Sequence, residues 1–165
     1  MAGLDRSDEG VVLRLDEEEV DVVASLAEGL AVRLADPTPD GEAGDELLER
    51  LAPTASRGDA ELDAELRSLL REDLMTSRVA RLRDLATGLR GGLEAGTYVR
   101  TLDRAEAMRI VEALNDLRIA LASTIGYERI ERGGLAVDDP RQDTLRLMDA
   151  LAWLQGGLIE YVDGD

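Results

Sequence analysis

The chain has 165 residues and contains no histidine, no cysteine and no lysine. These residue types supply most protein nucleophiles, most proton shuttles near neutral pH and most transition-metal ligands, so thiol chemistry, the usual zinc sites and lysine-dependent phosphate loops are excluded. The 36 acidic residues outnumber the 19 arginines, and the resulting net charge of −17 disfavours nonspecific binding to nucleic acids or anionic membranes.

The N-terminal third predicts a strand, a helix and a loop. Residues 11–15 form a short apolar run that is typical of a strand. Asp16 then opens a helix, with Glu19 at the capping-box position, and apolar residues at helical spacing continue to about Ala35. Two prolines and a glycine follow, so we expect a loop over residues 36–44.

The middle of the chain predicts two further helices and a second strand. A brief helix is expected over residues 45–51 and a long helix over residues 59–89. The pattern of the long helix is compatible with a kink near Glu72. Glycines between residues 91 and 96 break this pattern, and residues 97–101 again read as a strand.

The two predicted strands are followed by the same sequence pattern. Residues 12–19 and residues 99–106 each combine a strand, a Leu-Asp step and a capping box. Because a lone short strand cannot satisfy its backbone, we predict that the two strands pair, although a general strand-to-helix pattern would also explain the similarity. The helix that Asp103 opens is expected to end at Gly126, which is typical of a C-cap.

The last helix is expected over residues 140–162. Asp139 lies at its N-cap position, Pro140 in its first turn and Gln142 at the capping-box position.

Together these elements predict a mainly α protein. We expect a compact bundle of about five helices and a small two-stranded β ribbon made by the strands near 11–15 and 97–101. The length suits a single domain over residues 1–165, with residues 1–9 flexible. No apolar run approaches the ~20 residues that span a bilayer, and the first residues lack a secretory signal, so we expect a cytoplasmic protein.

Acidic clusters are the remaining candidates for catalysis or metal binding. Residues 17–19 and the pair Asp138-Asp139 could act as paired carboxylates, but both lie at expected helix starts, where capping explains them. Residues 36–41 are similar to the start of a calcium loop, yet Leu47 stands where that loop needs its bidentate acid. We therefore expect no catalytic residue, no cofactor and no metal site, and a protein that is not an enzyme.

The long helix carries a local excess of arginine. Four of its arginines fall on one face: Arg67, Arg71, Arg78 and Arg81. This stripe could bind an acidic partner or a phosphate. The alternative is a salt-bridged face, because acids are abundant and Asp63 lies four residues before Arg67.

Three polar residues lie beside the apolar stripe of the helix after Asp103, namely Asn115, Asp116 and Arg118. Polar groups so close to a core usually satisfy a neighbouring helix end or loop. We expect Arg118 to bond Asp138 or Asp139 at the start of the last helix, and Trp153 to lie in the core.

Three short motifs follow one another along the chain: residues 113–121 (ALNDLRIAL), residues 138–141 (DDPR) and residues 153–155 (WLQ). The residues that define them are Asn115, Asp116, Arg118, Asp138, Asp139, Pro140, Arg141, Trp153 and Gln155. In their order and spacing they resemble an uncharacterised actinobacterial domain family. Its genes commonly neighbour that of the protease adaptor ClpS, and some members are AosR-like oxidative-stress transcriptional regulators. We expect the motif residues to be structural.

The resemblance implies a cytosolic, mainly helical regulator with a role in stress-responsive gene expression. Without cysteine the chain cannot use a thiol switch, and its acidity favours a protein partner such as a sigma factor or RNA polymerase. We therefore expect a non-enzymatic regulator that acts by protein–protein contact. The alternatives are direct DNA binding through the stripe from Arg67 to Arg81 and an accessory role in Clp-type proteolysis. The last helix is apolar enough for either a homodimer or packing within the monomer.

Overall fold

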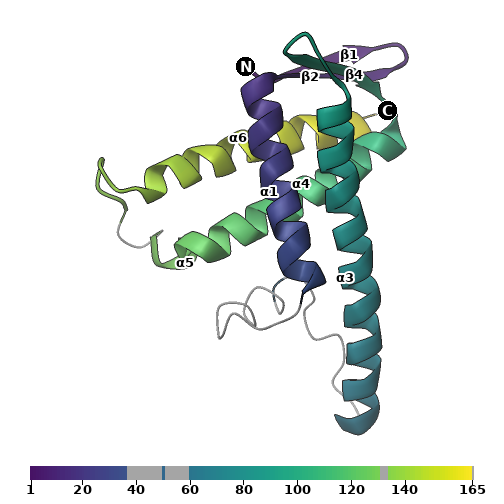
Figure 1. The fold of residues 1–165 in the computed structure, drawn as a ribbon, viewed down its shortest axis with the longest axis vertical. Coiled ribbons are helices and arrows are strands. Elements are labelled where there is room, and N and C mark those ends of the chain that lie inside the picture. Colours follow the sequence, from purple (N-terminus) through teal and green to yellow (C-terminus); the bar gives the residue numbers. More distant parts are fainter. Residues whose placement is uncertain (37–49, 51–59, 131–133, 165) are drawn as a thin grey trace.

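The structure is a computed structural model that describes residues 1–36, 50, 60–130 and 134–164 (Figure 1). The described residues are mainly helical, as predicted. The loop expected over residues 36–44 lies outside them apart from Asp36, and the brief helix expected over residues 45–51 lies outside them apart from Arg50.

The two predicted strands do pair, but they belong to a larger sheet. In the described residues four antiparallel strands have the order β1-β2-β4-β3. Their bounds are Gly3–Ser7 for β1, Gly10–Asp16 for β2, Leu93–Glu94 for β3 and Thr97–Leu102 for β4. The register of the central pair sets Val11 opposite Leu102 and Asp16 opposite Thr97. The prediction of a two-stranded ribbon was therefore wrong, and β1 occupies part of the segment expected to be flexible.

Alternation along β2 explains which face of the sheet meets the helices. Val11, Leu13 and Leu15 are buried, whereas Arg14 between them is exposed. One face of the sheet is thus apolar and the other polar, as in antiparallel sheets that cover a core on one side. The turn from β1 into β2 needs Gly10, whose φ is 156°, because a Cβ there would lie 2.2 Å from the backbone oxygen of Leu102.

The described residues form four long helices and one helical turn, rather than about five helices. The helices are α1 (Glu17–Ala35), α3 (Ala60–Gly91), α4 (Arg104–Ile125), the single turn α5 (Tyr127–Ile130) and α6 (Arg141–Asp163). No described helix is both long enough and apolar enough to traverse a lipid bilayer.

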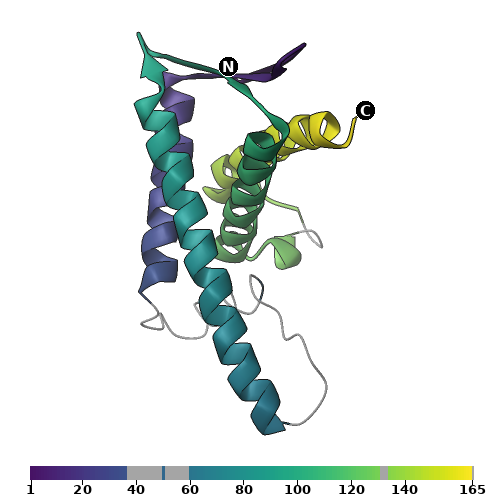
Figure 2. The same ribbon diagram turned by 90° about the vertical axis from the view of Figure 1, so that its right-hand side faces the viewer.

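The long helices form two antiparallel pairs that cross each other. Helix α1 packs against α3, and α4 packs against α6, while the sheet covers the end of the molecule where α1 begins and α3 ends (Figures 1 and 2). One apolar core joins all these layers. It includes Leu13 of β2, Ala27 of α1, Leu82 of α3, Leu114 of α4 and Leu158 of α6.

The predicted caps set several helix ends. Asp16 and Glu19 form a complete capping box at α1, as do Asp103 and Glu106 at α4. Gly126 ends α4 in the left-handed conformation, with φ of 64°. Glycine adopts that conformation without the steric cost that a Cβ adds.

The start of α6 differs from the prediction. The helix begins at Arg141, and Pro140 is its N-cap residue without a side-chain hydrogen bond. The carboxylate of Asp139 accepts from the Arg141 backbone at 2.9 Å, while the Gln142 side chain donates to the carbonyl of Ala136. Gln142 therefore forms no capping box, because its amide satisfies the preceding loop instead.

Helix α3 is much longer than its partner α1. At 1.5 Å per residue, its 32 residues span about 48 Å, against about 28 Å for the 19 residues of α1. Figures 1 and 2 show the first half of α3 projecting past the end of α1, and the helix passes Glu72 without a break. Among its described side chains, buried residues occur only between Met75 and Leu89.

Candidate functional site

A buried carboxylate lies where α3 crosses α4. Asp116, on α4, is 1% exposed and forms an ion pair with Arg78 of α3. A second arginine of α3, Arg81, places its NH1 atom 3.6 Å from Oδ2 of Asp116 and its Nε atom 3.1 Å from Glu112. A buried charge is stable only when it is paired, so the two arginines allow an aspartate to lie inside this crossing.

Burial and the arginines act on the pKa of Asp116 in opposite directions. Loss of hydration disfavours the charged form and is the larger effect, so the pKa of Asp116 lies above its ordinary value, although Arg78 and Arg81 both lower it. The charged form of the Asp116 carboxylate therefore depends on the two arginines more than that of an exposed carboxylate would.

Arg118 links α4 to α6 through a different partner from the one predicted. Its NH1 atom donates to Oε1 of Gln155 at 2.7 Å, and the amide of Gln155 donates to the backbone carbonyl of Val111 at 3.4 Å. The prediction that Arg118 bonds Asp138 or Asp139 was wrong. Gln155, which is buried on α6, lies within reach of Arg118 and supplies the acceptor.

Asp139 is satisfied within its own motif. Its carboxylate accepts from Nε and NH2 of Arg141, at 3.0 Å and 2.7 Å, besides the backbone bond described above. These contacts lower the pKa of Asp139 to about 2, chiefly through the hydrogen bonds from the Arg141 side chain. Residues 138–141 therefore form a self-contained turn before α6.

Two other motif residues reach the surface. Trp153, expected in the core, is 55% exposed on α6, where it lines a shallow hollow beside β1 with Leu4 and Arg6. The core beneath α6 is filled by aliphatic side chains such as Leu151, Leu154 and Leu158, which leave the indole outside. Asn115 is exposed as well, on the side of α4 that faces α3.

The four arginines of the predicted stripe have different surroundings. Arg78 and Arg81 form ion pairs with α4, as the salt-bridged interpretation requires. Arg71 is half-buried, and the side chain of Arg67, with that of Asp63, lies outside the described part. Partner binding by this stripe stays a prediction.

The projecting half of α3 carries an apolar row that the sequence analysis missed. Leu66, Leu69, Leu70 and Leu74 are between 42% and 58% exposed. Their spacing of three and four residues sets them along one side of the helix, and we call them the leucine stripe. The last of them, Leu74, borders a groove of about 330 Å³ that Asn115 and Gln155 also line. The spacing of the leucines is visible in the sequence, where arginines alternate with them.

The chain was compared with known proteins. A family model, the domain of unknown function DUF2017, matches residues 1–162. The chain belongs to the DUF2017 family. No match was found among curated proteins or among solved structures.

The match covers all the strands and all but the last residue of α6, so the DUF2017 domain includes the sheet, both helix pairs and the projecting half of α3. Within the described part of this domain, no three histidine, cysteine, aspartate or glutamate side chains are grouped closely enough to hold a metal ion. The crossing of α3 and α4 instead combines a paired ionic cluster, in which Oδ2 of the buried Asp116 accepts no hydrogen bond, with an adjoining apolar surface. Such an arrangement is suited to recognition of another molecule.

Proposed function

We propose that this DUF2017 protein is a non-enzymatic, cytoplasmic regulator that acts by protein–protein contact, with the leucine stripe of α3 as its docking surface. The supporting observation is the exposure of four leucines on one projecting helix. Full burial of one leucine side chain contributes about 1.5–3 kcal/mol of favourable free energy, so burying this row against a partner would favour binding. Leucines at intervals of three and four residues are the anchors by which a helix occupies an apolar groove.

Charge limits the kind of partner. The chain has a net charge of −17, so a partner with basic residues around an apolar groove is electrostatically complementary. The resemblance of the three motifs to AosR-like oxidative-stress regulators supports a partner from the transcription machinery, either a sigma factor or RNA polymerase. The protein would then act on stress-responsive transcription without touching DNA.

Direct DNA binding is less well supported. Arg78 and Arg81, half of the predicted stripe, already form ion pairs with Asp116 and Glu112. Phosphate contacts require arginines whose charge is not already neutralised by a carboxylate. An accessory role in Clp-type proteolysis rests only on the gene neighbourhood of the family that the motifs resemble.

Site-specific crosslinking tests the proposal. A photo-crosslinking amino acid replaces Leu69 in one variant and Arg146, an exposed residue of α6, in the control, and captured proteins are identified by mass spectrometry. We expect a sigma factor or RNA polymerase subunits at position 69 only. Clp components at position 69 would favour the proteolytic role, and equal capture at both positions would refute docking by the stripe.

Purified components then test the surface directly. The double variant Leu69→Ser/Leu70→Ser should weaken binding to the captured partner at least tenfold, because two apolar anchors are lost. Val32→Ser, which changes an exposed apolar residue of α1, is the matched control and should bind as the wild type does. Promoter DNA that binds the purified protein alone, with an affinity that falls steeply with salt, would instead support direct DNA contact.

A further inference from the structure

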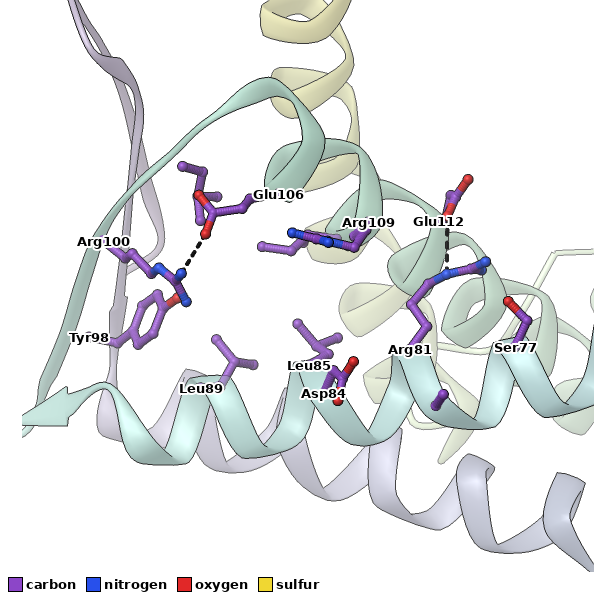
Figure 3. A pocket seen from close by; sticks show the side chains of 14 residues that line it. Ser77, Arg81, Asp84, Leu85, Leu89, Tyr98, Arg100, Glu106, Arg109 and Glu112 are labelled. Atoms are coloured by element: carbon purple, nitrogen blue, oxygen red, sulfur yellow. Dashed lines mark hydrogen bonds and ion pairs between the residues drawn. The ribbon is translucent and has the colours of Figure 1, made fainter.

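A second recognition feature lies on the other half of α3. A cleft of about 570 Å³ opens between the C-terminal half of α3, the strand β4 and the first turns of α4 (Figure 3). Its volume is in the range of small-molecule sites. The buried side chains of Leu85 and Leu89 give it an apolar base, and Tyr98 closes one end. The buried Leu102 also lines it.

Four of the six charged side chains that line the cleft form two ion pairs. Arg81 pairs with Glu112 at 3.1 Å, and Arg100 pairs with Glu106 at 2.5 Å. These two ion pairs lie towards the two ends of the cleft in Figure 3. Each brings together two different elements, α3 with α4 and β4 with α4, so the pairs hold the walls in place.

One cation and one anion remain between these pairs. Arg109 lies on the α4 wall and Asp84 on the α3 wall, facing each other across the opening (Figure 3). Within the part of the chain that the structure describes, neither side chain makes a hydrogen bond or an ion pair, with the other or with any third group. The middle of the cleft thus offers a free guanidinium opposite a free carboxylate, above an apolar base.

We propose that this cleft binds a zwitterion with an apolar substituent, namely an α-amino acid with an apolar side chain. The carboxylate of the ligand pairs with Arg109, whose planar fork matches it in two hydrogen bonds. The ammonium group pairs with Asp84, and the side chain lies over Leu85 and Leu89. An anion without an ammonium group would be repelled by Asp84, and a cation without a carboxylate would be repelled by Arg109.

One wall of the cleft is held rigid before any ligand arrives. Tyr98 is buried, and its ring packs so closely on Gly92 that a Cβ there would lie 2.7 Å from the ring. A preformed wall lowers the conformational entropy that binding costs. The leucine stripe does not line this cleft, so the inference stands independently of the proposed docking function.

Isothermal titration calorimetry with L-leucine, L-methionine and L-phenylalanine tests the assignment. We expect at least one to bind the wild type, and Asp84→Asn and Arg109→Gln each to weaken it about tenfold or more, because each variant removes one ionic contact. Arg83→Gln changes the exposed arginine next to Asp84, does not line the cleft, and should leave the affinity unchanged. Circular dichroism checks that each variant is folded.

Two analogues of leucine assign each half of the ligand to its residue. Leucinol lacks the carboxylate and is repelled by Arg109, so Arg109→Gln should strengthen its weak binding, whereas Asp84→Asn should weaken it further. The anion 4-methylpentanoate lacks the ammonium group and is repelled by Asp84, so Asp84→Asn should strengthen its binding, whereas Arg109→Gln should weaken it. The proposal is overturned if none of the three amino acids binds at about 10 mM, where even a ligand of millimolar affinity is detected. It is equally overturned if binding is unchanged in both variants.

Discussion

The strongest energetic prediction concerns the buried ion pair between α3 and α4. In the variant Arg78→Met the carboxylate of Asp116, which is 1% exposed, keeps only the contact of 3.6 Å to Arg81. Removing one partner of a buried pair typically costs 3–5 kcal/mol. Because Arg81 remains, we expect the lower end, a loss of about 3 kcal/mol in the free energy of unfolding at pH 7. Urea denaturation followed by circular dichroism measures it.

The same reasoning predicts how this loss depends on pH. Without Arg78 the pKa of Asp116 in the folded state rises further above its unfolded value, because burial then acts with less opposition. Below the unfolded pKa the aspartate is protonated in both states, so the variant suffers little there. Because wild type and variant share the unfolded pKa, the loss grows as the pH rises from the folded pKa of the wild type, which already lies above the unfolded value, through the higher folded pKa of the variant.

Replacing both partners of the ion pair distinguishes the cost of an unpaired buried charge from the cost of altered packing. Arg78→Met with Asp116→Leu leaves no buried charge, and its stability should lie within about 1 kcal/mol of the wild type. Arg83→Met, a surface change on the same helix, should be nearly neutral. A loss below about 1 kcal/mol for Arg78→Met, or a loss independent of pH, would refute the role assigned to the pair.

Four further substitutions test local features. NMR titration should place the pKa of Asp139 at about 2, and Arg141→Gln should move it up towards 3.8. The stability that this pair contributes is present above the unfolded pKa and is lost as the pH falls through about 2, so wild type and variant should converge in acid. Gly10→Ala should lower the free energy of unfolding by about 2 kcal/mol or more, measured by thermal or urea unfolding, because the added Cβ would collide with a β4 carbonyl. Gly126→Ala should lower it by only about 1 kcal/mol, because the space around Gly126 is open. Asp103→Ala should lower the stability by about 1 kcal/mol through the lost cap of α4, and a loss near zero would contradict the capping role.

Of the three capping boxes predicted from neighbouring residues, the two at Asp16 and Asp103 are confirmed and the one at Gln142 is wrong. The boxes at Asp16 and Asp103 combine a helix start with reciprocal backbone and side-chain bonds, all within four residues. The pairing of the two strands followed because an apolar strand needs a partner. The strand β1 was missed because its sequence, GLDRS, has no apolar alternation, and β3 was missed because two residues cannot show a period.

Contacts between helices were harder to predict than caps. Arg118 could reach several acceptors, and the sequence did not show that Gln155 would face it across the pair α4 and α6. Trp153 was expected inside because it is large and mostly apolar, but the aliphatic residues beside it fill the interface. In both cases the outcome depends on how α6 rotates about its axis, which is set by packing over the whole helix.

The long helix α3 connects the features that carry the functional arguments. Its C-terminal half is fixed on two sides, by apolar packing against α1 and by the ion pairs of Arg78 and Arg81 with α4. Ion pairs are more directional than apolar contacts, so the cluster around Asp116 constrains the angle at which α3 leaves the core. That angle determines where the leucine stripe is presented and how wide the cleft between α3 and α4 opens. The buried charge of Asp116 is therefore positioned where its ion pairs can fix the geometry of both the leucine stripe and the cleft.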